Sequence, residues 1–309
     1  MMPAEKNGIL VVGAGELGTA VLQSLTSHPS RDDSTPISLL LRKETITSDD
    51  PAKRSQADHF CSLGITLVPG DVVSDTHEAL ASTLRPFDTV IVCTGMWLPP
   101  GTQLRIARAS LAAGTRRLIP WQFGVDYDAI GAGSAQDLFD EQLVVRALLR
   151  SQTETQWTIL STGMFVSFLF EPSFAIVDLV GSVTRALGDW TTEVTVTTVE
   201  DIGRMVAEVI WLPDETTTGV VYVAGDTISY GRLAAVVEEV TGREFSRERW
   251  SVDFLKEELD RQPDDKLVKY RGVFAAGKGV SWPVEVSLNH RRGLKLASVA
   301  DYLRQRVRE

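Results

Sequence analysis

Short runs of aliphatic residues alternate with amphipathic stretches through the first half of the chain. The runs lack alternating polar positions, which is typical of strands buried on both faces. The predicted strands are Ile9–Val12, Ile37–Leu41, Ile65–Val68, Thr89–Cys93, Arg117–Ile119 and Trp157–Leu160. The stretches with helical spacing are Glu16–Ser27, Ser55–Leu63, His77–Leu84, Gln103–Ala113 and Ala135–Arg150. Strand–helix alternation with crossovers of this length predicts an α/β fold with a doubly wound parallel sheet.

The order of elements becomes mixed after about residue 163. The predicted elements there are the strands Thr192–Thr198 and Val220–Val223, the helices Glu200–Ile210 and Tyr230–Thr241, and the helical regions Val252–Asp260, Asp264–Phe274 and Leu296–Val307. We therefore expect a sheet domain over residues 1–162, to which elements of 190–225 return. Residues 163–309 are expected to form a smaller α+β substrate or lid domain, packed against the first because no linker is visible.

Composition excludes several classes of protein. The chain has 309 residues, 43% of them hydrophobic, as in an ordinary globular protein. Its 31 Lys and Arg against 41 Asp and Glu give a formal net charge of −10, which argues against nucleic acid as the main ligand. No apolar run is long enough to span a membrane, and two cysteines fit a reducing compartment. Four scattered histidines without metal-ligand spacing predict no metal site. We expect a cytoplasmic protein, monomeric or homodimeric.

A glycine motif follows the first predicted strand directly and precedes a helix. Gly13, Gly15 and Gly18 form G-x-G-x-x-G, in which the glycines allow a tight turn, close approach of a pyrophosphate and close helix–strand contact. The amides at Glu16 and Leu17 would face the phosphates. In this context the motif predicts a dinucleotide-binding Rossmann sheet, although a glycine-rich turn that binds nothing is the structural alternative.

The end of the second predicted strand indicates which dinucleotide is bound. An NAD site places an acidic side chain there to accept the ribose 2′-hydroxyl. This chain has Arg42 and Lys43 instead, which suit a 2′-phosphate and favour NADP(H) over NAD(H). A solvated basic turn is the alternative.

Further cofactor contacts are expected wherever a predicted parallel strand ends, because these carboxyl ends border the crevice. After the third strand, either the Asp71 side chain or the amide of Val72 can meet the adenine. The other candidates follow the fourth and fifth strands and are Thr94, Gly95, Met96, Gln122 and Phe123.

Several segments together resemble the NmrA-like/isoflavone-reductase-like group of atypical short-chain dehydrogenases. They are GAGELG, RK, GD, IPWQFGVD, FDEQLVVRALL, STGMF, VEDIGRMVAEVI and ISYGRLAAVVEEVTGREF. The resemblance covers most of the chain up to about residue 245. It implies binding of NADPH and reduction of aromatic or heterocyclic natural products, or, as in some members, sensing of NADP without turnover.

Two departures from the family pattern concern catalysis. Enzymatic members usually read S-E-F-G where this chain has Trp121–Gln122–Phe123–Gly124, and Gln142 stands at the position of their active-site lysine. No tyrosine here is followed four residues later by lysine, so the common Tyr-x-x-x-Lys site is absent as well. Glutamine does not act as a general acid near neutral pH. The chain therefore lacks the proton donor that lysine supplies for carbonyl reduction in the family.

The chemistry that remains is hydride transfer to a C=N or C=C bond, or acid/base cyclisation through an iminium with the nucleotide as scaffold. Glu141 or Glu171 would stabilise a cation or move protons, although a solvated helix residue is an equal alternative for Glu141. Gln142 can hydrogen-bond a ribose or the substrate. The rival from another class is a non-catalytic NADP-sensing regulator. Aromatic residues near the ends of the fourth, fifth and sixth predicted strands favour a bulky, flat, apolar substrate. The imine or iminium chemistry implies that this substrate contains nitrogen, and we expect it to belong to specialised metabolism, such as that of alkaloids. The expected substrate-binding residues are Trp97, Trp121, Tyr127, Met164, Phe165 and Phe168.

Overall fold

The computed structural model describes residues 7–308, which form two compact units. The first comprises the chain up to Gln122 together with Val144–Leu160 and Ile202–Val221. The second comprises Phe123–Leu143, Ser161–Asp201 and the chain from Tyr222 onward. Residues 123–143, which the sequence placed with the sheet, thus belong to the second unit.

The first unit is built on a parallel sheet, which has seven strands among the described residues. Its strands are β1 (Ile9–Val12), β2 (Ile37–Leu41), β3 (Thr66–Pro69), β4 (Thr89–Val92), β5 (Arg117–Ile119), β6 (Gln156–Ser161) and β11 (Gly219–Tyr222). The spatial order is β11-β6-β5-β4-β1-β2-β3, and the order reverses between β1 and β4. This is a Rossmann-like sheet, as the pattern of the first half predicted. β11 supplies the strand that returns from the second half.

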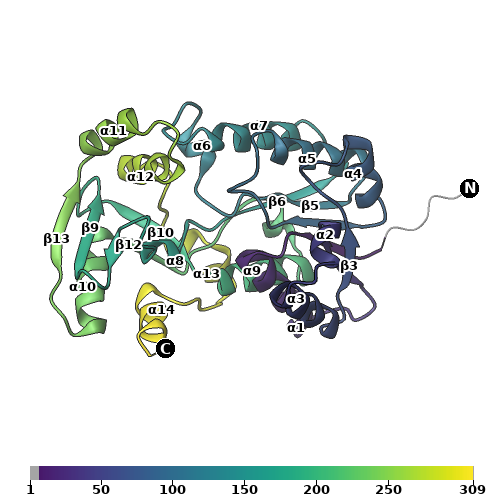
Figure 1. Ribbon diagram of the computed structural model, residues 1–309, viewed down its shortest axis with the longest axis horizontal. Helices are drawn as coiled ribbons and strands as arrows, with labels where there is room; N and C mark the ends of the chain where they lie inside the picture. The colour runs from purple at the N-terminus through teal and green to yellow at the C-terminus, as the bar shows by residue number, and fades with distance from the viewer. Residues whose placement is uncertain (1–6, 309) are drawn as a thin grey trace, which may run out of the picture. The chain divides into compact units, whose positions relative to one another are not determined.

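Helices cover both faces of this sheet. The helices of the unit are α1 (Glu16–Ser27), α2 (Lys43–Ile46), α3 (Pro51–Ser62), α4 (His77–Leu84), α5 (Thr102–Ala112), the end of α7 (Leu138–Arg150), α9 (Val199–Trp211) and the 3-10 turn η1 (Glu215–Thr217). Figure 1 shows α4 and α5 on one face and α1 and α9 on the other. Leu80, Ile106 and Val145 bring α4, α5 and α7 into one core cluster with Leu10 and Val90 of the sheet. Both faces are therefore buried, which explains the uninterrupted aliphatic strands.

The second unit holds two smaller sheets, each with three strands in the described part of the chain. Their strands are β7 (Met164–Phe165), β8 (Val177–Asp178), β9 (Val183–Leu187), β10 (Glu193–Thr197), β12 (Asp226–Ser229) and β13 (Ser246–Trp250). One sheet has the order β12-β10-β7 and the other β13-β9-β8. The predicted strand at 192–198 is thus β10, which belongs to this unit and not to the large sheet.

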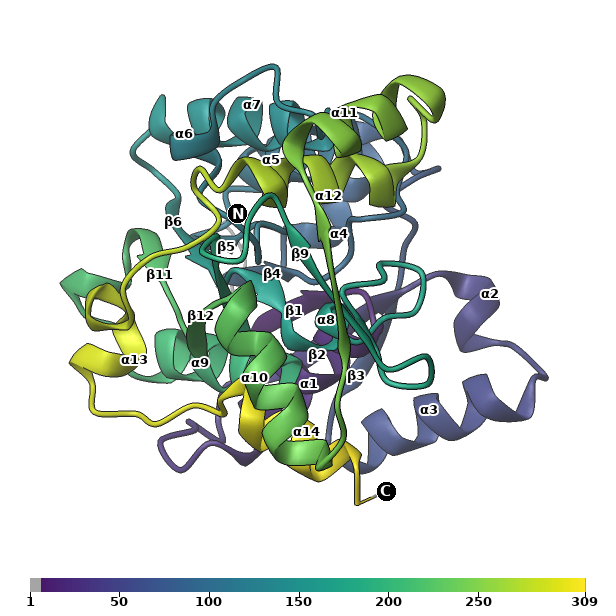
Figure 2. The same cartoon turned by 90° about the vertical axis from the view of Figure 1, so that its left-hand side faces the viewer.

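The helices of the second unit pack around these two sheets. They are α6 (Tyr127–Ile130), the start of α7, α8 (Val166–Leu169), α10 (Tyr230–Thr241), α11 (Val252–Arg261), α12 (Lys266–Ala276), the 3-10 turn η2 (Val284–Val286), α13 (Leu288–Arg291) and α14 (Val299–Arg306). β9 and β13 run parallel and side by side (Figure 2). Phe174, Tyr230, Leu233 and Leu255 are among the residues of one continuous core. The predicted smaller α+β portion is therefore present.

Candidate dinucleotide site

The three glycines of the turn after β1 meet different structural requirements. Gly13 has φ +97°, a conformation that side chains other than glycine rarely adopt. A Cβ added to Gly18 would lie 2.0 Å from the carbonyl oxygen of Gly13, so α1 packs directly on the turn. A Cβ added to Gly15 would meet nothing within 4 Å, which leaves open space where a ligand can approach the backbone.

Gly15 is also the N-cap of α1 and offers no side-chain cap to the first amides of this helix. Uncapped amides at the start of a long helix are donors suited to phosphate oxygens. Glu16 is exposed at this end, whereas Leu17 is buried, so Leu17 can contribute only its backbone. The turn therefore fits a diphosphate group.

A cavity of about 260 Å³ lies at the carboxyl ends of β1, β2, β3 and β4. Its lining consists of Val12, Gly13, Leu40, Leu41, Arg42, Thr45, Gly70, Asp71, Val72, Val73, Thr94 and Leu98. The fold thus brings together five candidates that are far apart in the sequence, namely Gly13, Arg42, Asp71, Val72 and Thr94. Small-molecule sites usually measure roughly 300–1,000 Å³, so this cavity suits one part of a dinucleotide, such as its adenosine.

The two basic candidates after β2 have different positions. Arg42, the N-cap residue of α2, lines the cavity, and Thr45 lines it one turn later. Lys43 is exposed as the first residue of α2 and is not among the lining residues. Arg42 is consequently the stronger candidate for a 2′-phosphate contact.

Asp71 organises the turn that follows β3. Its carboxylate accepts a hydrogen bond from the amide of Val73 (2.8 Å), and its own amide donates to Asp75 (2.8 Å). Partial burial opposes ionisation of this carboxyl group, but the hydrogen bonds from Val73 and Ser74, with the charge of Arg42, outweigh it and lower the pKa of Asp71. Because the side chain is engaged within its own turn, the backbone at Val72 is the better candidate for an adenine contact.

Gln56 of α3 is a residue that the sequence analysis missed. Its amide nitrogen donates to the carbonyl of Ala14 in the glycine turn (3.0 Å). The helix was expected from Ser55, but it begins at Pro51, and its N-cap Asp50 accepts from the amides of Ala52 and Lys53. An Asp–Pro pair is a recognised helix start, so the signal was present in the sequence.

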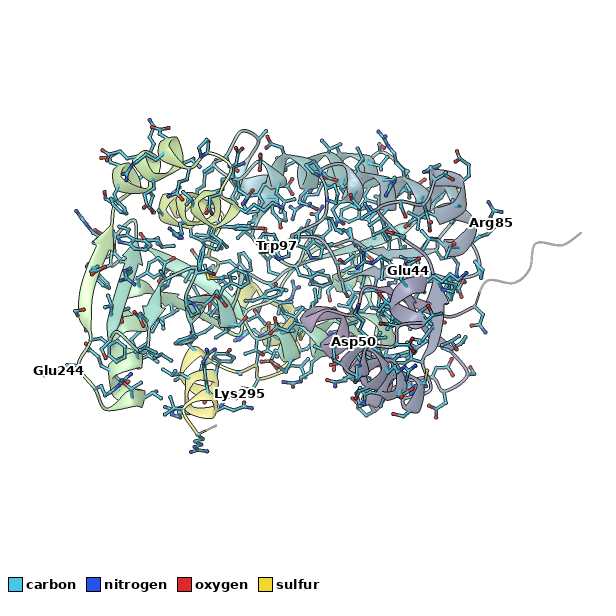
Figure 3. The ribbon with its side chains drawn as sticks, viewed as in Figure 1. Glu44, Asp50, Arg85, Trp97, Glu244 and Lys295 are labelled. Carbon is cyan, nitrogen blue, oxygen red and sulfur yellow. The ribbon has the colours of Figure 1, made fainter. Side chains whose placement is uncertain are left out.

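The loop from β4 to α5 carries four of the candidates, Thr94, Gly95, Met96 and Trp97. The carbonyl of Thr94 accepts a hydrogen bond from the side chain of Gln103 (2.8 Å), which holds the loop to α5. Trp97, labelled in Figure 3, is 71% exposed, whereas Met96 is half-buried. Gly95 lies against the indole of Trp121, which follows β5.

Gln122 is fully buried, and its side-chain oxygen accepts a hydrogen bond from the guanidinium of Arg146 (2.8 Å). Arg146 is itself fully buried on the last turns of α7. A buried guanidinium requires acceptors, so Gln122 stabilises this arginine. Phe123, the next candidate, is 7% exposed.

The three catalytic candidates occupy different environments in the second unit. Gln142 is 1% exposed on α7, and its neighbour Glu141 is half-buried. Glu171 is exposed after α8, where its carboxylate accepts from the hydroxyl and amide of Ser173 at 2.9 and 3.3 Å. This arrangement makes Glu171 a turn-capping residue, and Glu141 the stronger candidate for proton transfer.

The aromatic candidates of the second unit belong partly to its core. Tyr127 is 4% exposed and packs edge-to-face on Phe139, with a ring separation of 4.8 Å. Met164 is 5% exposed in the same core cluster. Phe165 and Phe168 are half-buried, and Phe168 packs against that cluster. The expectation of a substrate wall therefore rests more on Phe165 and Phe168 than on Tyr127 and Met164.

The NmrA-like family model matches residues 5–300. The chain belongs to the NmrA-like family. The resemblance expected from the sequence motifs is thereby confirmed. A curated relative, an NmrA-like family domain-containing oxidoreductase of Gibberella moniliformis, is 48% identical over 96% of this chain and 97% of its own length. Phenylcoumaran benzylic ether reductase of Betula pendula is 26% identical over 98% of this chain and all of its own.

Solved structures at 20% sequence identity share the fold. Isoflavone reductase superposes with a TM-score of 0.78 at 20% identity, covering 97% of this chain and 99% of its own. The complex of leucoanthocyanidin reductase with NADPH from Vitis vinifera superposes with a TM-score of 0.79, also at 20% identity, with the same coverage. The Rossmann-like architecture with a smaller C-terminal portion is confirmed by these likenesses.

Neither a membrane-spanning helix nor a metal centre is found in the described residues. Across positions 7–308, every helix is too short or too polar to cross a bilayer. In the same part of the chain, no three His, Cys, Asp or Glu side chains are grouped to hold a metal ion.

Proposed function

We propose that the protein is an NADP(H)-dependent oxidoreductase of specialised metabolism. Its expected reaction is hydride transfer to a C=N or C=C bond of a bulky, flat, aromatic and nitrogen-containing small molecule. The observation that carries the proposal is the cavity at the strand ends, where the glycine turn and Arg42 border one space. The oxidoreductase named among its relatives and the NADPH complex among its structural neighbours support it.

The residues at this cavity fit NADP(H). The open space at Gly15 and the uncapped amides of α1 suit the diphosphate, and Arg42 suits the 2′-phosphate. The backbone at Val72 borders the space proposed for adenine. When bound, the cofactor would supply a hydride. The other residues that line the cavity would orient the cofactor and exclude water.

Gln142 determines which substrates are compatible with this assignment. It is buried, and an amide provides hydrogen bonds without releasing a proton near neutral pH. A ketone or enone needs a proton as well as a hydride, whereas an iminium ion carries its own positive charge. Addition of hydride to C=N⁺ yields an amine without a proton from the protein. We therefore place iminium-type substrates first, with Glu141 as the carboxylate that stabilises the cation.

The presence of Gln142 in place of a proton-donating lysine also favours a second candidate function. The half-buried carboxylate of Glu141 suits cyclisation through an iminium, in which a ring closes and a proton leaves without net redox change. The dinucleotide would then be a structural ligand. Pictet–Spengler-type closure is the reaction class.

One experiment separates these functions. The protein is incubated with NADPH and 3,4-dihydroisoquinoline, or with an arylethylamine and an aldehyde, and both cofactor and product are followed. Loss of NADPH with formation of the cyclic amine supports the reductase, and a ring-closed product with unchanged NADPH supports the cyclase. No turnover with a stable protein complex would indicate a sensor. Calorimetry that detects no binding of NADP⁺ or NADPH would overturn all three.

A further inference from the structure

The loop between β4 and α5 presents Trp97 at the apex of a tight turn. The amide of Leu98 donates to the carbonyl of Gly95 (3.0 Å), so Met96 and Trp97 are the two central residues. Met96 is half-buried, and Trp97 is 71% exposed. Among exposed aromatic side chains in residues 7–308, Phe254 is the other example, at 37%.

The indole of Trp121 packs against the backbone of this turn. A Cβ added to Gly95 would lie 1.9 Å from Cδ2 of Trp121, so the Trp121 ring rests on the Gly95 backbone. Even an alanine at this position would displace the ring. Close packing of this kind fixes the Gly95 backbone. Because Trp97 belongs to the same turn, the direction of its side chain is fixed as well.

The loop is fixed on its far side as well. The Thr102 hydroxyl donates to the carbonyl of Pro99 (2.7 Å), and the side chain of Gln103 donates to the carbonyl of Thr94 (2.8 Å). Leu98 packs against the core cluster of this unit and lines the cavity. The exposure of Trp97 is therefore a property of an anchored turn.

Trp97 lies in the loop that leads toward the expected position of the nicotinamide ring of the cofactor. The cavity spans the ends of β1 to β4, on the adenosine side of the point where the strand order reverses. A dinucleotide crosses that point, so its nicotinamide half extends past Thr94 toward the ends of β4 and β5. Trp97 lies three residues after Thr94, in the loop that begins at this end of β4. A large indole left in water loses burial free energy, which contact with an apolar ligand would recover.

We propose that Trp97 is a specificity-determining residue, which selects flat aromatic substrates by stacking its indole on their ring system. The inference rests on the proposed function, because it needs the cofactor to set the place of the substrate. Trp121 supports the turn by packing on Gly95, and Trp97 is the residue that contacts the ring of the substrate. A saturated substrate of similar size offers no π-face and gains less from the contact.

Calorimetry on the full chain with saturating NADP⁺ tests this, using 2-naphthol and its saturated analogue decahydro-2-naphthol. The measured quantity is the ratio of their dissociation constants in the native protein and in Trp97→Leu, Trp97→Phe and Val180→Ala. Val180→Ala is the matched control, since Val180 is an apolar side chain, 95% exposed, in the turn between β8 and β9. We expect Trp97→Leu to reduce the preference for the flat ligand about tenfold, Trp97→Phe to retain most of it and Val180→Ala to leave it unchanged.

The outcomes distinguish this inference from the proposed function. If Trp97→Leu keeps the native preference, or if the native protein binds NADP⁺ but shows no preference for the flat ligand, the role of Trp97 is wrong and the oxidoreductase stands. If the native protein fails to bind NADP⁺, the proposed function is wrong and this inference falls with it. Binding of NADP⁺ is expected to be unchanged in all variants.

Discussion

Alanine at Gly18 should lower the stability of the fold, whereas alanine at Gly15 should lower the affinity for the cofactor, although the two glycines belong to one motif. A Cβ at Gly18 would lie 2.0 Å from the carbonyl oxygen of Gly13 and 2.9 Å from its carbonyl carbon. These are backbone atoms, so relief requires α1 to move about 1 Å away from the turn. A Cβ at Gly15 would meet nothing within 4 Å, and its φ of −70° suits alanine.

The magnitudes follow from these contacts. Overpacking of a tight contact costs about 1–3 kcal/mol, more where only backbone can yield. Alanine is about 1 kcal/mol more favourable than glycine within a helix, which offsets part of this cost. We therefore expect Gly18→Ala to lower the free energy of unfolding by about 2 kcal/mol. At Gly15, the loss of a glycine N-cap and the reduced entropy of the unfolded chain nearly cancel, within about 0.5 kcal/mol.

Binding should separate the two variants further. Gly15→Ala fills the space left for the diphosphate, so we expect affinity for NADP⁺ to fall at least tenfold, about 1.4 kcal/mol, in a protein of native stability. Urea unfolding followed by circular dichroism gives the stability, and calorimetry gives the affinity. Native stability in Gly18→Ala, or native affinity in Gly15→Ala, would refute the argument.

Three further changes test the site. Arg42→Ala should weaken NADPH binding about tenfold or more while leaving NADH binding nearly unchanged, and Lys43→Ala should have the smaller effect; equal losses for the two cofactors in calorimetry would contradict the 2′-phosphate assignment. The lowered pKa of Asp71 means that its ionised form stabilises the fold at neutral pH, and that this contribution disappears as pH falls through the folded-state pKa. Urea midpoints measured from neutral to acidic pH should therefore decline less steeply in Asp71→Asn, and an unchanged slope would show that the turn does not depend on this charge. Gln142→Lys should create new activity toward ketones or enones in a cofactor-oxidation assay, whereas Gln142→Met, which supplies no proton, should not.

The large sheet and the glycine turn could be predicted because their signals are local. A strand buried on both faces must be aliphatic throughout, and β1, β2 and β5 begin and end where the sequence predicts. The position of the glycine motif between a strand and a helix likewise specified its geometry. Short-range chemistry sufficed for these features.

The smaller sheets could not be predicted in the same way. β7 and β8 contain two residues each, and β13 has four polar residues before its last residue, Trp250, so none shows a clear hydrophobic pattern. β7 and β13 pair with strands distant in the sequence, β10 and β9 respectively. The contact of Gln56 with Ala14 is of the same kind, because nothing near Gln56 in the sequence indicates the glycine turn.

The amino-acid sequence by itself determined the strand–helix alternation, the glycine turn and the basic residues after β2, because each depends on neighbours a few positions away. Tertiary structure alone decided that Arg42 and not Lys43 lines the cavity, that the Asp71 carboxylate serves its own turn, and that Tyr127 and Met164 belong to a core. A side chain's role in a site depends on direction and burial, which arise only when segments far apart in the chain pack together.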